Sequence, residues 1–207
     1  MLPVGFVLLS VIIRLVSGGK YAWGIVQGRA RPNPITWFLW GLTAMIAFFA
    51  QLQQGFTGQS FVLLALGITP LTVCVIALMK HGIQRYLTSF TLSCASIALV
   101  GIILWRITAQ PSIAIVFSII ADIFASLPTL RKSYEDPSSE YPLPYLLSMV
   151  SMLITLLTIR SWAFVTYAFP LYMFGINLVL FSFAALPLQE MARIHLSIVP
   201  QLSDEEE

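Results

Sequence analysis

Two ionisable side chains lie inside stretches of sequence that are otherwise apolar. Asp122 interrupts the run from 111 to 130, and Arg14 is the one cation deep within the run from 3 to 26. Because charge is expensive inside a bilayer, an ionisable residue in a segment that could span one is a functional candidate by default. Asp122 could exchange a proton or bind a cation, or it could form a structural pair with Arg14. The sequence leaves both interpretations open.

The other polar residues form no familiar catalytic or metal-binding pattern. There is no Gly-rich phosphate loop, no H-E-x-x-H motif and no Ser/His/Asp set. His81 and His195 are far apart, while Cys74 and Cys94 lie in apolar runs without paired spacing, as expected for small buried side chains. No basic patch suggests nucleic acid. We therefore predict no enzymatic activity, no metal, no cofactor and no nucleic-acid partner.

The composition is that of an integral membrane protein. Hydrophobic residues make up 58% of the chain and charged residues 10%, whereas soluble domains carry about 25% charged residues. The apolar runs are continuous and lack a period of two, which argues against a β-barrel. We predict an all-α protein with seven transmembrane helices, each close to the length that a bilayer requires. The predicted segments are 3–26, 34–52, 61–79, 83–107, 111–130, 142–159 and 163–188.

Lysine and arginine are distributed unequally between the two sides of such a bundle. One side receives Arg106 and Arg160, and the other receives most of the remaining cations. The positive-inside rule therefore predicts an N-terminus outside and a cytoplasmic C-terminus, in what we expect to be a prokaryotic cytoplasmic membrane. The cations of the positive side are Lys20, Arg29, Arg31, Lys80, Arg85, Arg131, Lys132 and Arg193.

A junction of helix, basic loop, prolines and helix occurs twice. In the first copy a helix is predicted to end near Gly24, before Pro32-Asn33-Pro34; in the second a helix is predicted to end near Pro128, before Pro142-Leu143-Pro144. We align Pro32 with Pro142. A slip of two residues then aligns Gly67-Ile68-Thr69 with Gly175-Ile176-Asn177, and the equivalent of Asp122 falls near Ser17-Gly18.

The alignment predicts four parts. Two repeats of three helices are joined by one helix, so both copies enter the membrane in the same direction. The parts are a first repeat (1–79), a linker helix (80–109), a second repeat (110–188) and a cytoplasmic tail (189–207).

This three-plus-one-plus-three plan resembles that of SWEET transporters, and the junctions resemble the PQ-loop. Pro128-Thr129 stands where the family has Pro-Gln, and the sequence from Leu130 to Leu147, L-R-K-S-Y followed by S-E-Y-P-L-P-Y-L-L, is similar to its basic loop and helix start. Neither copy has the literal Pro-Gln pair, and the first has Gly24 in place of the proline. The chain is identified as a divergent member of the SWEET and PQ-loop seven-helix superfamily.

The resemblance implies a substrate site near the bilayer midplane, between the repeats, faced by polar residues of each third helix. Asn177 and Thr69 match those positions, with Met173 and Phe174 beside Asn177 on its helical face. Trp40 could stack on a solute. The paired asparagines of the relatives are not reproduced, so sugar binding does not carry over. Asn177 could instead form a hydrogen bond between helices.

From this resemblance we expect a transporter of a small polar solute that works by alternating access. The resemblance also permits proton coupling through Asp122, and the other interpretation of Asp122, a structural pair with Arg14, stays open. The alternative is a receptor or scaffold that binds a ligand or peptide on the same fold. The expected partners are the solute and the lipid bilayer, and a homo-oligomer is compatible with the sequence. The expected hinge residues are Gly24, Pro32, Pro34, Pro128, Pro142 and Pro144.

Overall fold

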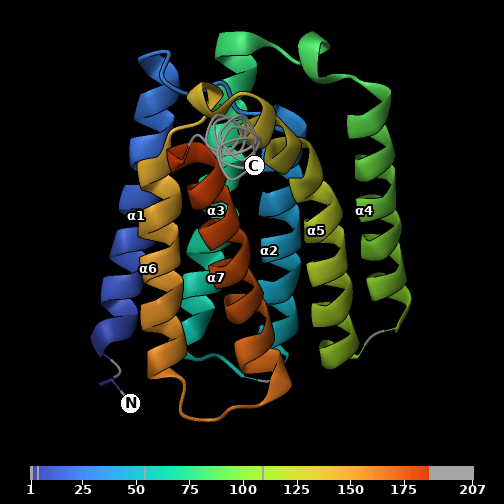
Figure 1. Ribbon diagram of the computed structural model, residues 1–207. Coiled ribbons are helices and arrows are strands. Elements are labelled where there is room, and N and C mark those ends of the chain that lie inside the picture. Colours follow the sequence, from blue (N-terminus) through green and yellow to red (C-terminus); the bar gives the residue numbers. More distant parts are fainter. Residues whose placement is uncertain (1, 4, 54, 109, 187–207) are drawn as a thin grey trace, which may run out of the picture.

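A computed structural model describes residues 2–3, 5–53, 55–108 and 110–186. Within these ranges the chain forms seven α-helices and two short 3-10 helices, without strands (Figure 1). The prediction for the tail, 189–207, lies outside the described residues. The elements are α1 (Gly5–Val26), α2 (Pro34–Leu52), α3 (Gly58–His81), η1 (Gln84–Tyr86), α4 (Ser89–Thr108), α5 (Pro111–Glu135), η2 (Pro137–Ser139), α6 (Pro142–Thr158) and α7 (Phe164–Ala185).

Prolines begin three of the helices. Pro34, Pro111 and Pro142 are the first residues of α2, α5 and α6, where a missing N–H does no harm and the fixed φ suits a helix. Before α2, the Asn33 side chain accepts a hydrogen bond from the backbone N of Ile35 at 3.1 Å. Local sequence alone therefore explains where these helices start.

The prediction that a helix ends near Pro128 is wrong. The α5 helix continues to Glu135, and Pro128 lies in its interior. Proline removes one helical hydrogen bond, but the following turns are supported by an ion pair between Arg131 and Glu135 at 2.7 Å, at the i, i+4 spacing that favours helices. Similarly, α4 begins at Ser89 rather than 83, because η1 fills the connection.

Five helices, α1, α2, α3, α5 and α7, are long and apolar enough to cross a membrane. The 17 residues of α6 and the stretch Ser89–Val100 of α4 are apolar but shorter. Large apolar side chains point outward along the bundle, among them Leu8, Val75 and Leu153. Such a surface suits lipid rather than water, which is consistent with an integral membrane protein.

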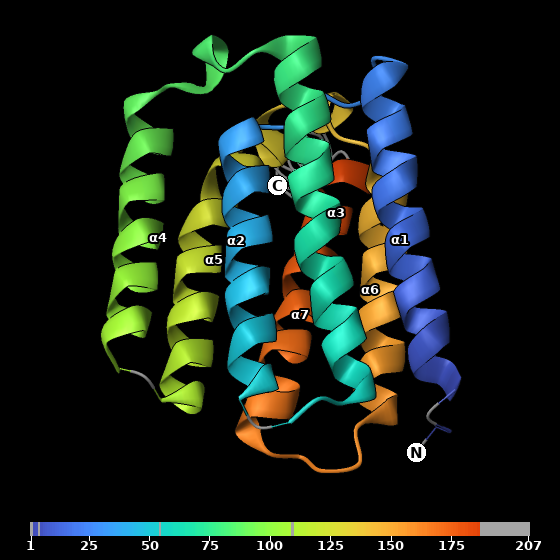
Figure 2. The same cartoon turned by 180° about the vertical axis from the view of Figure 1, so that it is seen from behind.

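Six helices form a ring. The order around it is α1, α3, α2, α5, α7, α6 and back to α1, because each of these helices packs against the next. The α4 helix stands outside the ring against α5 and, less extensively, α2 (Figures 1 and 2). This order places α1 opposite α5, α3 opposite α7 and α2 opposite α6.

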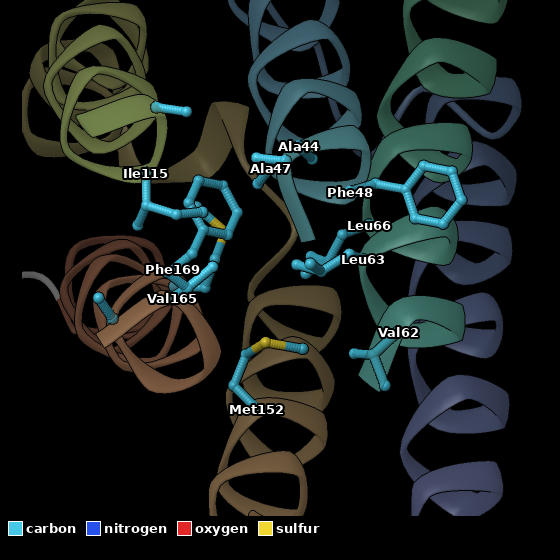
Figure 3. Close-up of a cluster of buried hydrophobic side chains, with 14 of the residues drawn as sticks. Ala44, Ala47, Phe48, Val62, Leu63, Leu66, Ile115, Met152, Val165 and Phe169 are labelled. Carbon is cyan, nitrogen blue, oxygen red and sulfur yellow. The ribbon is translucent and has the colours of Figure 1, made fainter. Parts of the chain in front are cut away.

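The buried apolar side chains form a plug across the bundle at the end where the N-terminus lies. Figure 3 shows this cluster converging from α2, α3, α5, α6 and α7. We call its central members, which are Phe48, Leu66, Ile115, Met152 and Phe169, the apolar plug; each is at most 8% exposed. A second cluster nearer the opposite end contains Tyr21, Trp37 and Tyr145.

Candidate functional site

A cavity lies between the apolar plug and the second cluster. All six helices of the ring line it, and its charged lining residues are Arg14 and Asp122, both near the middle of their helices. Its volume is about 40 Å³, room for roughly three water molecules. A solute the size of a sugar therefore requires the helices to move apart.

The structure brings five of the predicted site residues to this one cavity. They are Arg14, Trp40, Asp122, Met173 and Asn177. Whether they bind a solute stays a prediction, but the structure brings them together from four helices, α1, α2, α5 and α7, that are far apart in sequence.

Thr69 and Phe174 have other surroundings. The Thr69 hydroxyl donates to the carbonyl of Ala65 at 2.8 Å, and its methyl group faces Gly18, where an added Cβ would lie 2.8 Å from Cγ2. Phe174 packs, partly buried, against the cluster that contains the apolar plug. From α3 the cavity is lined by Leu66 and Pro70, so the lining face is rotated relative to the prediction.

Asp122 is fully buried and held by hydroxyl groups. Oδ1 accepts from Thr43 on α2 at 2.6 Å, and Oδ2 accepts from Tyr172 on α7 at 2.8 Å. The Ser126 hydroxyl donates to the backbone carbonyl of Asp122 at 2.7 Å and accepts from Trp40 Nε1 at 2.8 Å. The acid thus connects α5 to its two neighbours in the ring.

Arg14 is also buried, yet it forms no ion pair with any described residue. Its Nη1 donates to Ser148 Oγ on α6 at 2.5 Å, and its Nε has no hydrogen-bond acceptor in the part of the chain that the structure describes. Of the three ion pairs among the described residues, none joins Arg14 to Asp122. The structural pair that the sequence left open is therefore not formed; the two side chains face the same cavity from opposite helices.

Asn177 makes its hydrogen bond within its own helix. Nδ2 donates to the carbonyl of Met173 at 2.7 Å, so the alternative of a hydrogen bond between helices is not seen. Among the described residues no group bonds its Oδ1, which leaves an acceptor at the edge of the cavity.

Next to the other end of the cavity lies a buried acid that sequence reasoning missed. Glu140 Oε2 accepts hydrogen bonds from Tyr21 and, at 2.8 Å, from Tyr145, both of which line the cavity. Lys132 Nζ lies 2.6 Å from Glu140 Oε1 and donates to the carbonyl of Arg31 at 2.5 Å. We call Tyr21, Lys132, Glu140 and Tyr145 the Glu140 latch. It ties the loop before α2 to the loop before α6.

The predicted hinge residues lie at or near this latch. The Gly24 carbonyl accepts a hydrogen bond from the backbone N of Arg29 at 2.8 Å. A Cβ added at Gly24 would lie 3.1 Å from the ring of Tyr141. Pro144 lines the cavity, and its carbonyl accepts from Ser17 at 2.6 Å. Hinge motion at these positions stays a prediction.

A basic cleft lies beside the latch, between η1, the start of α4 and the end of α5. Four cations line it, Arg31, Arg85, Arg131 and Lys132. Three of these form ion pairs with acids: Arg31 with Asp136, Arg131 with Glu135, and Lys132 with Glu140. The cleft therefore carries little uncompensated charge.

Compared with known proteins, the chain matches no family model, no curated protein sequence and no solved structure. The geometry of the cavity and of its two closures is therefore what a functional assignment depends on.

Proposed function

We propose that the protein is a membrane transporter that moves a small polar solute by alternating access. The observation that carries this proposal is one charged cavity midway along the helices, with the apolar plug at one end and the Glu140 latch at the other. Alternating access requires such a central site and two closures that open in turn. We assign the protein no enzymatic activity, cofactor or metal.

The packing of the helices supports a parallel repeat of three helices, which this mechanism uses. In each half the third helix packs between the other two, α3 between α1 and α2, and α7 between α5 and α6. The halves meet at two equivalent interfaces, α1 with α6 and α2 with α5, and α4 is the linker. On these grounds we keep the three-plus-one-plus-three plan, and membership of the SWEET and PQ-loop superfamily, as part of the proposal.

The helix starts favour a different register from the sequence alignment. Pro34 and Pro142 both begin a helix, and their separation along the chain equals that between Gly67 and Gly175. No slip is then required. In this register the counterpart of Asp122 is Arg14 rather than Ser17-Gly18, so the repeats carry opposite charges at equivalent positions.

We further propose that the latch faces the cytoplasm and the plug faces outside. The basic residues Arg31, Arg85, Arg131 and Lys132 gather around one cleft at the latch end, as the positive-inside rule requires of a cytoplasmic side. The N-terminus is then outside, and the last described helix ends inside.

Asp122 is the coupling acid of the proposal. Its carboxylate accepts from Thr43 across the α2–α5 interface, which joins the two repeats. A proton taken up by the carboxylate would weaken this bond and loosen the interface. Proton uptake and helix movement would thereby share one contact, which is the physical requirement for coupling.

The test is solvent access to the cavity from each side of the membrane. Ala44 and Ala47, one turn apart on α2, both belong to the cluster that contains the apolar plug, but of the two only Ala44 lines the cavity. In a background with Cys74 and Cys94 replaced by alanine, we expect Ala44→Cys to react with a membrane-impermeant maleimide added to either side, and Ala47→Cys to react much more slowly.

Labelling of Ala44→Cys from one side only would favour the receptor alternative. Labelling from neither side, with the protein folded, would overturn the transporter proposal.

A further inference from the structure

We propose that the solute is a small zwitterion of the α-amino acid type, whose carboxylate binds Arg14 and whose ammonium group binds Asp122. This inference rests on the proposed function and names its substrate class. It starts from the two buried charges that share the cavity without touching each other.

No described residue places an anion in contact with Arg14. Its guanidinium is buried, one nitrogen donates to Ser148, and Nε has no acceptor among the described residues. Breaking up or omitting the partner of a buried charge is strongly unfavourable. The planar donor fork of arginine matches a carboxylate, which it can bind through two parallel hydrogen bonds.

Asp122 has room for a cation. A carboxylate offers about four lone-pair sites, and three side-chain hydroxyls contact it, those of Thr43 at 2.6 Å, Tyr172 at 2.8 Å and Ser126 at 3.5 Å. No ion pair involves Asp122 among the described residues. The Oδ1 of Asn177, another lining residue, is a second acceptor for an ammonium group.

The placement of the two charges selects against other classes of solute. Arg14 and Asp122 come from helices that lie opposite each other in the ring, so both contact whatever fills the cavity. A monocarboxylate would present a second negative group to Asp122, and an amine would leave Arg14 uncompensated. A neutral sugar would leave both charges without a partner. A zwitterion compensates both.

The cavity also limits size. With a volume of about 40 Å³ and the rings of Trp37, Trp40 and Tyr21 among its walls, it favours a solute with a small side chain, for which the helices must move apart less than for a sugar. Alanine is therefore the probe that we choose.

The experiment is calorimetric titration of the purified full-length protein in lipid nanodiscs. We expect L-alanine to bind. Lactate and isopropylamine each lack one of the two charged groups, and we expect their affinities to be lower than that of alanine by a factor of roughly 30 or more. Glucose should not bind. If lactate binds as tightly as alanine, or if glucose displaces alanine, the inference is overturned.

Variants test whether Arg14 and Asp122 are the residues that bind alanine. Arg14→Gln and Asp122→Asn should each abolish alanine binding, whereas Arg14→Lys should retain part of it. Thr72→Ala is the control, since this exposed hydroxyl bonds only the Ile68 carbonyl of its own helix. Unchanged alanine binding in Arg14→Gln would contradict the inference. If a charge variant does not fold, the inference is tested by the selectivity of the wild-type protein among alanine, lactate, isopropylamine and glucose.

The two proposals can fail separately. If alanine binds but does not enter proteoliposomes, the zwitterion site stands and the transporter proposal fails. If alanine does not bind although Ala44→Cys reacts from both sides, the transporter proposal stands and the zwitterion inference fails.

Discussion

Thr43 on α2 donates a hydrogen bond of 2.6 Å to Asp122 on α5, and this bond crosses the interface between the two helices. The interface between α1 and α6 carries the bond of 2.5 Å from Arg14 to Ser148. Each interface thus places one buried charge against a hydroxyl at the edge of the same cavity.

Thr43→Val should weaken the α2–α5 interface. The substitution keeps the shape of the side chain and removes a donor to a buried carboxylate, so we expect a loss of about 1–2 kcal/mol of stability. Thermal unfolding in nanodiscs measures it. Thr72→Val is the matched control, because that hydroxyl is exposed and bonds within its own helix. Equal destabilisation by the two variants would show that the interface bond contributes nothing specific.

Glu140→Gln should open the latch side of the cavity. The variant removes the anion that pairs with Lys132 at 2.6 Å, and the side chain of Glu140 is fully buried while that of Lys132 is 23% exposed. We expect faster maleimide labelling of Ala44→Cys from that side and a stability loss of about 2 kcal/mol, less than for a fully buried pair.

Glu135→Gln provides the comparison for the latch. Glu135 pairs with Arg131 on the surface, where both side chains are more than half exposed, and such pairs contribute about 0–1 kcal/mol. Labelling of Ala44→Cys should be unchanged in this variant. A latch role for Glu140 is excluded if the two glutamine variants label at the same rate.

Phe169→Ala should open the plug side. Phe169 is fully buried in the apolar plug, and removing its ring leaves a void beside the cavity; substitutions of this kind lose about 3–5 kcal/mol. Labelling of Ala44→Cys from the plug side should become faster. Phe49→Ala, at a side chain that is 51% exposed, should leave both stability and labelling nearly unchanged, and a similar response in the two variants would refute a closing role for the plug.

Replacing either of two glycines with alanine should change the stability of the protein, in opposite directions at the two positions. At Gly18 a Cβ would lie 2.8 Å from Thr69 Cγ2 and would push α1 away from α3, whereas at Gly175 it would meet no atom within 4 Å. We expect Gly18→Ala to lower stability by about 1–3 kcal/mol. Gly175→Ala should raise it by up to about 1 kcal/mol through helix propensity. Unfolding temperatures of the two variants check this, and a stabilising Gly18→Ala would disprove the close α1–α3 approach.

Several features of the fold could be predicted because they depend on local sequence. Continuous apolar runs predict helices that bury their own backbone hydrogen bonds, and prolines mark helix starts because they lack an N–H. The starts at Pro34, Pro111 and Pro142 were therefore predictable. Asp122 could also be recognised from local sequence, since it is an acid within an otherwise apolar run. The end of α5 was not, because a proline inside a helix and one that terminates it look alike until the following turns are known.

Local hydropathy was enough to locate the apolar helices and the two charged residues that interrupt them. Which helix faces meet depends on how the helices pack. Thr69 and Pro70 are neighbours, and a rotation of α3 places one against Gly18 and the other against the cavity. Glu140 resembles any acid in a polar loop until folding brings Tyr21, 119 positions away, to its carboxylate. Arg14 and Asp122 likewise share a cavity only because the ring sets their helices opposite each other. Such contacts depend on packing between distant segments, which local hydropathy does not encode.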